Sequence, residues 1–199
     1  MGTKTPMMFK EMLALMLVGT AAALSLSLTE PPRYSQTPAN ADAREMSEFT
    51  GRVATYVALH KKLAASLPKV PDKATPEQIH AHQIALEKLL TGARSTAKKG
   101  DVFGPGMTVV VRKLLLPVFR GPGGDDIRRA IHDEPHPVQP VVNKRYPDEV
   151  PLSTMPPDVL KMLPKLEETL EYRFIGRHLI LLDVPAHLIV DVIDNAMPA

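Results

Sequence analysis

The stretch LEYRFIGRHLILLDVPAHLIVDVID, residues 170–194, decides the fold of this chain. Apolar and polar residues alternate along it, which is the period of a half-buried strand. Gly176-Arg177 suits a two-residue hairpin turn with glycine in the first position. Pro185-Ala186 marks a second turn. We therefore expect a three-stranded antiparallel meander.

The two turns also predict the register of the strands. The first turn places Tyr172 opposite Leu181, and a short second loop places Leu181 opposite Val190 and Ile180 opposite Asp191. One face of the meander is then apolar, so we expect helices to cover it. That inward face consists of Leu170, Tyr172, Phe174, Leu179, Leu181, Leu188, Val190 and Val192, with Asp183 at its end.

The opposite face carries the candidate binding residues Glu171, Arg173, His178 and Asp191, mixed with aliphatic side chains. One interpretation is a solvated charged face, and the other is a small binding patch that faces a partner. Surface ion pairs add only about 0–1 kcal/mol each. We therefore expect Asp191→Ala to cost less than about 1 kcal/mol. Leu181→Ala should cost about 2–5 kcal/mol, because it opens a cavity.

The N-terminus has the pattern of an export signal. Lys4 and Lys10 precede the uncharged run 12–28, which contains small residues, and this combination is typical of a secretory signal. An uncleaved membrane anchor is the alternative, although the run is shorter than the ~20 residues of a typical span. We assign residues 1–27 to the signal or anchor. Residues 28–43, which are polar and proline-rich, are expected to be a disordered linker.

Residues 44–134 are expected to form a helical region. Apolar residues at steps of three and four predict a first helix over 42–66. A second helix is expected to begin at Thr75, in a capping box with Gln78, and to close at Gly100. Because the connection between these helices is short and marked by prolines, we expect an antiparallel hairpin.

Two shorter helices are expected after the hairpin. The first spans residues 105–120, although its valine run 109–111 also permits a strand and Pro117 would kink or end the helix. The second runs to about His132 with Asp125 or Asp126 as its cap. Both belong to the helical region.

Residues 135–199 form the C-terminal part of the chain. Its proline-rich beginning offers Val138, Val141 and Val142 for an edge strand, and a short helix is expected over 154–163, ahead of the meander. The predicted fold class is therefore α+β. It combines an N-terminal antiparallel helical hairpin and further short helices with a small C-terminal three-stranded antiparallel meander.

The composition argues against several chemistries. The chain has no cysteine, which excludes disulfides, thiol nucleophiles and cysteine-bound zinc. A net charge of +2 provides no basic field for nucleic acid. No nucleophile, metalloprotease or phosphate-loop motif occurs in the sequence. We therefore expect no catalytic residues, no cofactor, no bound metal and no nucleic-acid partner.

The segment LPKLEETLEYRFIGRHLILLDVPAHLIVDVI, residues 163–193, is similar to a C-terminal module of secreted bacterial proteins. In that module a proline-flanked short helix precedes a tyrosine-containing strand, a strand ending in Leu-x-Asp and a third aliphatic strand. Periplasmic proteins of the nickel/cobalt-efflux accessory type share this outline. The chain after residue 27 also resembles an uncharacterised family of secreted bacterial proteins. The resemblance implies no functional residues.

Two functions remain open from the sequence. The first is an exported, non-enzymatic envelope protein that acts as a binding or interaction module for an unknown protein or envelope component. The second is a periplasmic metal-binding or metal-responsive accessory protein, as the resemblance implies. Both place the protein in the bacterial periplasm or outside the cell. Membrane contact is expected only through residues 1–27, if they stay attached.

Overall fold

Four antiparallel strands form the sheet for which the sequence predicted three. In this computed structural model, β2 (Leu170–Ile175), β3 (His178–Asp183) and β4 (Leu188–Ile193) follow one another as a meander. A two-residue edge strand, β1 (Lys144–Arg145), pairs with β4, so the strand order is β1-β4-β3-β2. The predicted edge strand therefore exists, but it begins two residues after Val142. With five helices beside this sheet among the residues that the structure describes, the α+β class is confirmed.

The structure describes residues 38–133, 139–152 and 154–198. The predicted signal or anchor, residues 1–27, lies outside these ranges, as do residues 28–37 of the predicted linker. Residues 38–43, also assigned to the linker, instead form the first turns of α1 (Pro38–Ala64). Among the described residues, no helix is both long enough and apolar enough to cross a membrane.

The predicted register is confirmed between β2 and β3 and only in part between β3 and β4. Tyr172 lies opposite Leu181 as predicted. Between β3 and β4 the pairing shifts by one residue at Leu181/Leu182, so Leu181 lies opposite Asp191 and not opposite Val190. The extra residue in β4 is a β-bulge, which changes the face to which the following side chains point. The predicted sides of Asp191 and Val192 are therefore wrong.

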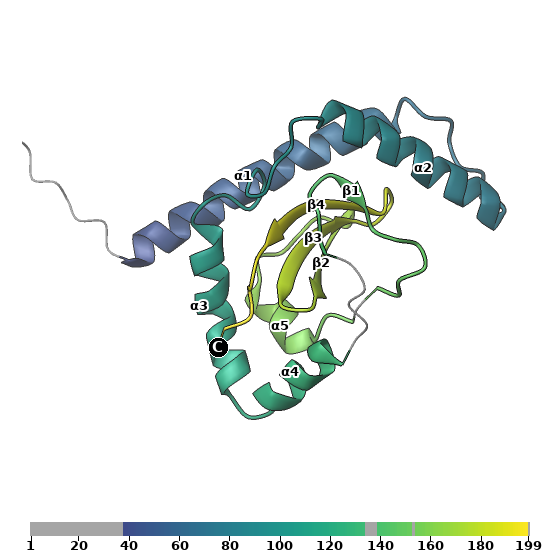
Figure 1. The fold of residues 1–199 in the computed structure, drawn as a ribbon. Coiled ribbons are helices and arrows are strands. Elements are labelled where there is room, and N and C mark those ends of the chain that lie inside the picture. Colours follow the sequence, from purple (N-terminus) through teal and green to yellow (C-terminus); the bar gives the residue numbers. More distant parts are fainter. Residues whose placement is uncertain (1–37, 134–138, 153, 199) are drawn as a thin grey trace, which may run out of the picture. The chain divides into compact units, whose positions relative to one another are not determined.

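The second helix, α2 (Pro76–Ala93), begins as predicted and ends early. Thr75 and Gln78 form both hydrogen bonds of the capping box. The helix ends seven residues before Gly100. Near this end the side-chain amide of Asn143 donates to the carbonyl oxygens of Thr91 and Arg94 at distances of 3.1 and 3.0 Å. A long-range contact that no local pattern encodes is therefore present at this end of the helix. In Figure 1 α2 runs back toward the end of α1 and meets it at an angle, and the two helices are in contact.

Three further helices complete the helical side. They are α3 (Met107–Arg120), α4 (Gly124–His132) and α5 (Pro157–Met162), all close to their predicted positions. The predicted cap of α4 is wrong: its N-cap is Gly123, at a φ of 83°, while Asp125 and Asp126 lie in the first turn. Only glycine adopts that backbone conformation without a steric cost, so backbone geometry determines the start of α4.

Both faces of the sheet are buried. The helices pack on one face around Phe49, Leu90, Val111 and Leu181, which belong to one continuous core. The other face carries a second cluster, in which Tyr146 packs with Ile180, Leu182, Ile189 and Val192. The expectation of a largely solvated second face is therefore wrong. The segment that contains β1 and Tyr146 covers its centre, and the charged residues of that face are confined to its margins.

Candidate functional site

Asp191, one of the four candidate binding residues, is a buried structural group. Its carboxylate accepts hydrogen bonds at 2.8 Å from the backbone N–H groups of Gly100, Val102 and Phe103. A fourth bond comes from the N–H of Val192. The residue is 0% exposed. Asp191 therefore fixes the loop between α2 and α3 on the sheet, and it belongs to no surface patch.

A second buried carboxylate, Asp183, joins α1 to the sheet. It accepts a hydrogen bond from the hydroxyl of Tyr56 at 2.6 Å and lies 2.6 Å from Nδ1 of His60. The backbone N–H of Ala186 donates to its other oxygen at 2.9 Å. Burial raises the pKa of Tyr56, so the phenol keeps the proton that it donates.

The sequence analysis did not predict this Tyr–Asp–His cluster, although the spacing of its residues contains a signal for it. Tyr56 and His60 are four residues apart, so they share one face of α1, and Asp183 ends a strand on the face that the helices cover. The guanidinium of Arg94 lies 5.1 Å from the ring centre of Tyr56. Because Asp183 is 0% and His60 5% exposed, the cluster is closed to a substrate and holds elements together.

His178, the third candidate residue, belongs to an ion-pair group at the end of β3. Its Nδ1 lies 2.9 Å from a carboxylate oxygen of Asp194, which also pairs with Lys99. The hydrogen bond from Lys99, together with that of His178, holds the pKa of Asp194 below its usual range. His178 therefore has a charged partner of its own.

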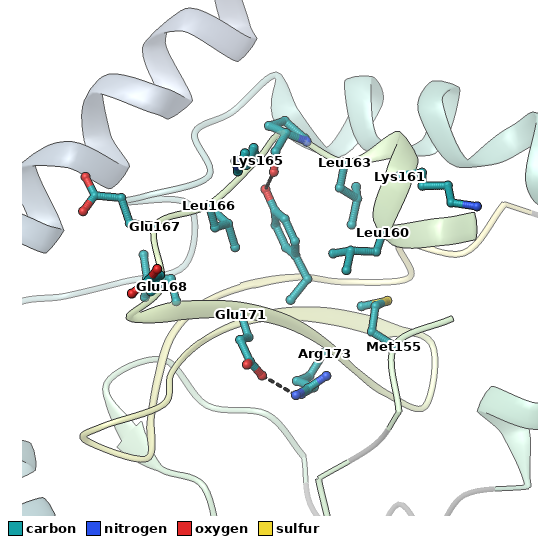
Figure 2. Close-up of a pocket in the computed structure, with 13 residues that line it drawn as sticks. Met155, Leu160, Lys161, Leu163, Lys165, Leu166, Glu167, Glu168, Glu171 and Arg173 are labelled. Carbon is teal, nitrogen blue, oxygen red and sulfur yellow. Dashed lines mark hydrogen bonds and ion pairs between the residues drawn. The ribbon is translucent and has the colours of Figure 1, made fainter. Parts of the chain in front are cut away.

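Glu171 and Arg173, the two remaining candidates, line a cleft of about 500 Å³ between α5 and β2. Figure 2 shows Leu160 and Leu163 of the α5 region on one side of β2, and the Glu171–Arg173 ion pair on the other side. The lining combines aliphatic groups with charges of both signs. It comprises Met155, Leu160, Lys161, Leu163, Pro164, Lys165, Leu166, Glu167, Glu168, Leu170, Glu171, Tyr172 and Arg173.

The lining of the cleft contains aliphatic side chains and has no net formal charge. Three basic and three acidic side chains line it, so their formal charges cancel. Leu160 is 50% exposed, although a leucine gains free energy by burial. Tyr172 anchors the inner wall, since its hydroxyl donates to the carbonyl oxygen of Pro164 at 3.0 Å. Burial raises the pKa of this phenol as well.

Arg173 has hydrogen-bonding capacity to spare. Its Nη2 pairs with the carboxylate of Glu171. Its Nε is buried and has no acceptor in the part of the chain that the structure describes. An unpaired buried donor is unfavourable, so the guanidinium is suited to an additional acceptor at the cleft.

Two of the four candidate binding residues predicted from the sequence therefore lie together in the structure. Glu171 and Arg173 share the cleft, whereas His178 and Asp191 have other partners. The sequence did not reveal the opposite wall of the cleft, because Leu160 and Lys165 come from a segment whose position relative to β2 is a tertiary feature.

No protein-family model, curated protein or solved structure matches this chain. Within the described ranges, no group of three or more histidine, aspartate or glutamate side chains is arranged to hold a metal ion.

Proposed function

We propose that this chain is an exported binding module, and that the cleft between α5 and β2 holds an extended peptide segment of a partner protein. The observation that supports the proposal most directly is the half-exposed Leu160 in a cleft whose lining alternates aliphatic and charged groups. The cleft volume lies within the ~300–1,000 Å³ range of ligand sites.

The balance of charges favours a peptide over a simple anion or cation. A ligand with one sign of charge would meet three like charges in the lining. A peptide carries aliphatic side chains and charges of both signs along a narrow chain, which complements this lining. The cleft is also recessed beside an edge strand, and edge strands are frequent sites of peptide recognition.

The main polar groups elsewhere in the structure support a binding role over catalysis. Asp183 and Asp191, the carboxylates that are fully buried in the described ranges, accept hydrogen bonds that join structural elements. The charged side chains at the cleft are suited to bind a ligand and to orient it.

Export supports an envelope role for the module. The basic N-terminus and the uncharged run 12–28 favour passage of the chain into the periplasm or beyond. Partners would then be proteins or other components of the bacterial envelope.

Selection from a random heptapeptide display library against the full chain tests the proposal. Selected peptides are then titrated against the unmodified protein and two variants. Leu160→Asp removes the exposed leucine from the cleft. Val109→Asp changes an equally exposed residue of α3 that does not line the cleft.

We expect Leu160→Asp to weaken peptide binding by roughly 10- to 100-fold, because burying a leucine contributes about 1.5–3 kcal/mol. Val109→Asp should bind as the unmodified protein does. If no peptide is selected, or if both variants bind equally well, the proposed function is wrong.

A further inference from the structure

We propose that the bound peptide pairs with β2 as an antiparallel strand, and that it carries an acidic, an aliphatic and a basic residue in that order. Arg173, Tyr172 and Glu171 would read these three positions. This inference rests on the proposed function and adds the direction and the charge order of the ligand.

The backbone of β2 directs the peptide groups of Tyr172 away from the sheet. β2 is the last strand in the order β1-β4-β3-β2. Ile175 pairs with His178 across the hairpin turn, and the N–H of Val184 donates to the carbonyl of Thr169. Because hydrogen-bonded pairs alternate along an antiparallel ladder, the N–H and C=O of Tyr172 point outward.

These two groups of Tyr172 have no hydrogen-bond partner in the described part of the chain. Tyr172 is only 2% exposed, so the walls of the cleft shield them from solvent. Unpaired and shielded peptide groups are rare and unfavourable. A ligand strand beside β2 would satisfy both groups.

The side chains beside Tyr172 select one charge order. In an antiparallel pair, the ligand residue opposite Tyr172 is preceded by the one opposite Arg173 and followed by the one opposite Glu171. Opposite charges stabilise cross-strand pairs, and like charges destabilise them. An acidic residue therefore belongs before the central residue and a basic residue after it. The central side chain points to the same face as Tyr172, toward the leucines of the α5 region.

The ion pair between Glu171 and Arg173 leaves both side chains with unused hydrogen-bonding capacity. The side chain of Glu171 is 41% exposed and that of Arg173 is 21% exposed. Nε of Arg173 is without an acceptor among the described residues. Binding would exchange one ion pair within β2 for two pairs across the new strand boundary.

A second copy of the chain is a poorer occupant than a peptide. Two β2 edges could also place Glu171 of each copy opposite Arg173 of the other. The edge is recessed behind α5, however, and paired strands must approach to ~4.8 Å. Two folded bodies with recessed edges do not reach that distance, whereas one extended chain does.

Three acetylated and amidated peptides test the charge order: TVDIKVT, TVKIDVT and TVSISVT. Each is titrated against the full chain and against the double variant Glu171→Lys/Arg173→Glu. We expect the unmodified protein to bind TVDIKVT about tenfold more tightly than TVKIDVT, because two cross-strand charge pairs change sign between them. The double variant should reverse this preference.

Hydrogen exchange reports the strand pairing independently. Binding of TVDIKVT should protect the amide of Tyr172 from exchange. If the three peptides bind equally and leave that amide unprotected, the strand-pairing inference is wrong while the peptide-binding function stands. If none of them binds and display selection also yields no ligand, both are wrong. If the double variant does not fold, the preference of the unmodified protein for TVDIKVT over TVKIDVT still tests the charge order. If the chain dimerises through β2 in the absence of peptide, a second copy is the occupant and the peptide inference is wrong.

Discussion

Replacing Asp191 with alanine should destabilise the protein severely, which reverses the expectation drawn from the sequence. The substitution leaves the N–H groups of Gly100, Val102 and Phe103 without their acceptor. Each buried donor that loses its partner costs about 1–3 kcal/mol. Partial rearrangement of the loop would recover some of this loss, so we expect a total cost of about 3–5 kcal/mol.

That cost is large beside the roughly 5–15 kcal/mol that stabilises a typical domain. Urea unfolding of the two proteins, followed by circular dichroism, measures the difference in the free energy of unfolding. Asp191→Asn serves as an intermediate, because it keeps one carbonyl oxygen at the site and loses the charge. We expect it to cost less than the alanine variant.

The matched control is Asp194→Ala, three residues along the chain. The side chain of Asp194 is 46% exposed and, among the described residues, its carboxylate pairs with Lys99 and His178. Its replacement should cost less than about 1 kcal/mol. If Asp191→Ala is no more damaging than Asp194→Ala, the loop does not depend on this carboxylate, and our account of Asp191 is refuted.

Four further outcomes are expected. Leu181→Ala should cost about 2–5 kcal/mol in urea unfolding, since Leu181 is fully buried between the sheet and the helices. Thr75→Ala should cost about 0.5–2 kcal/mol, and an unchanged thermal transition would exclude the capping box as a source of stability. The hydrogen bond from Arg145, with that of His187, lowers the pKa of Asp148 from 3.8 to about 2. This stabilisation is complete above pH ~4 and is lost as the pH falls toward 2, so the stability difference between the unmodified protein and Asp148→Asn should shrink over that interval and be constant above it. A fusion of residues 1–27 to a reporter that is active only outside the cytoplasm should be active, and cytoplasmic retention of the full-length protein would contradict export.

Local patterns predicted the parts of the fold that local interactions determine. The capping box at Thr75 and the turn at Gly176-Arg177 each depend on residues close together in the chain, and both were predicted correctly. The end of α2 is bound by Asn143, about fifty residues away, and Asp191, beside the bulge in β4, accepts hydrogen bonds from the α2–α3 loop. Such long-range partners leave no periodic signal in the sequence.

The same distinction applies to the candidate site. Parity along β2 correctly put Glu171 and Arg173 on one side of the strand, because alternation is a local property. The same alternation placed Asp191 on that side as well. This placement was wrong, because a bulge in β4 interrupts the alternation of side chains. The leucines of the α5 region, which make the opposite wall, were expected only as part of a short helix.

The two buried aspartates show where this protein obtains its tertiary specificity. The chain has no cysteine to cross-link its segments. Asp183 instead joins α1 to the β3–β4 turn, and Asp191 joins the α2–α3 loop to β4. A buried carboxylate is costly unless every partner is in place, so each one favours a single arrangement of the elements that it connects. The helical layer is therefore fixed on β3 and β4. β2, at the free end of the sheet, has no such carboxylate bond among the described residues, and that strand is where we place the binding of a partner.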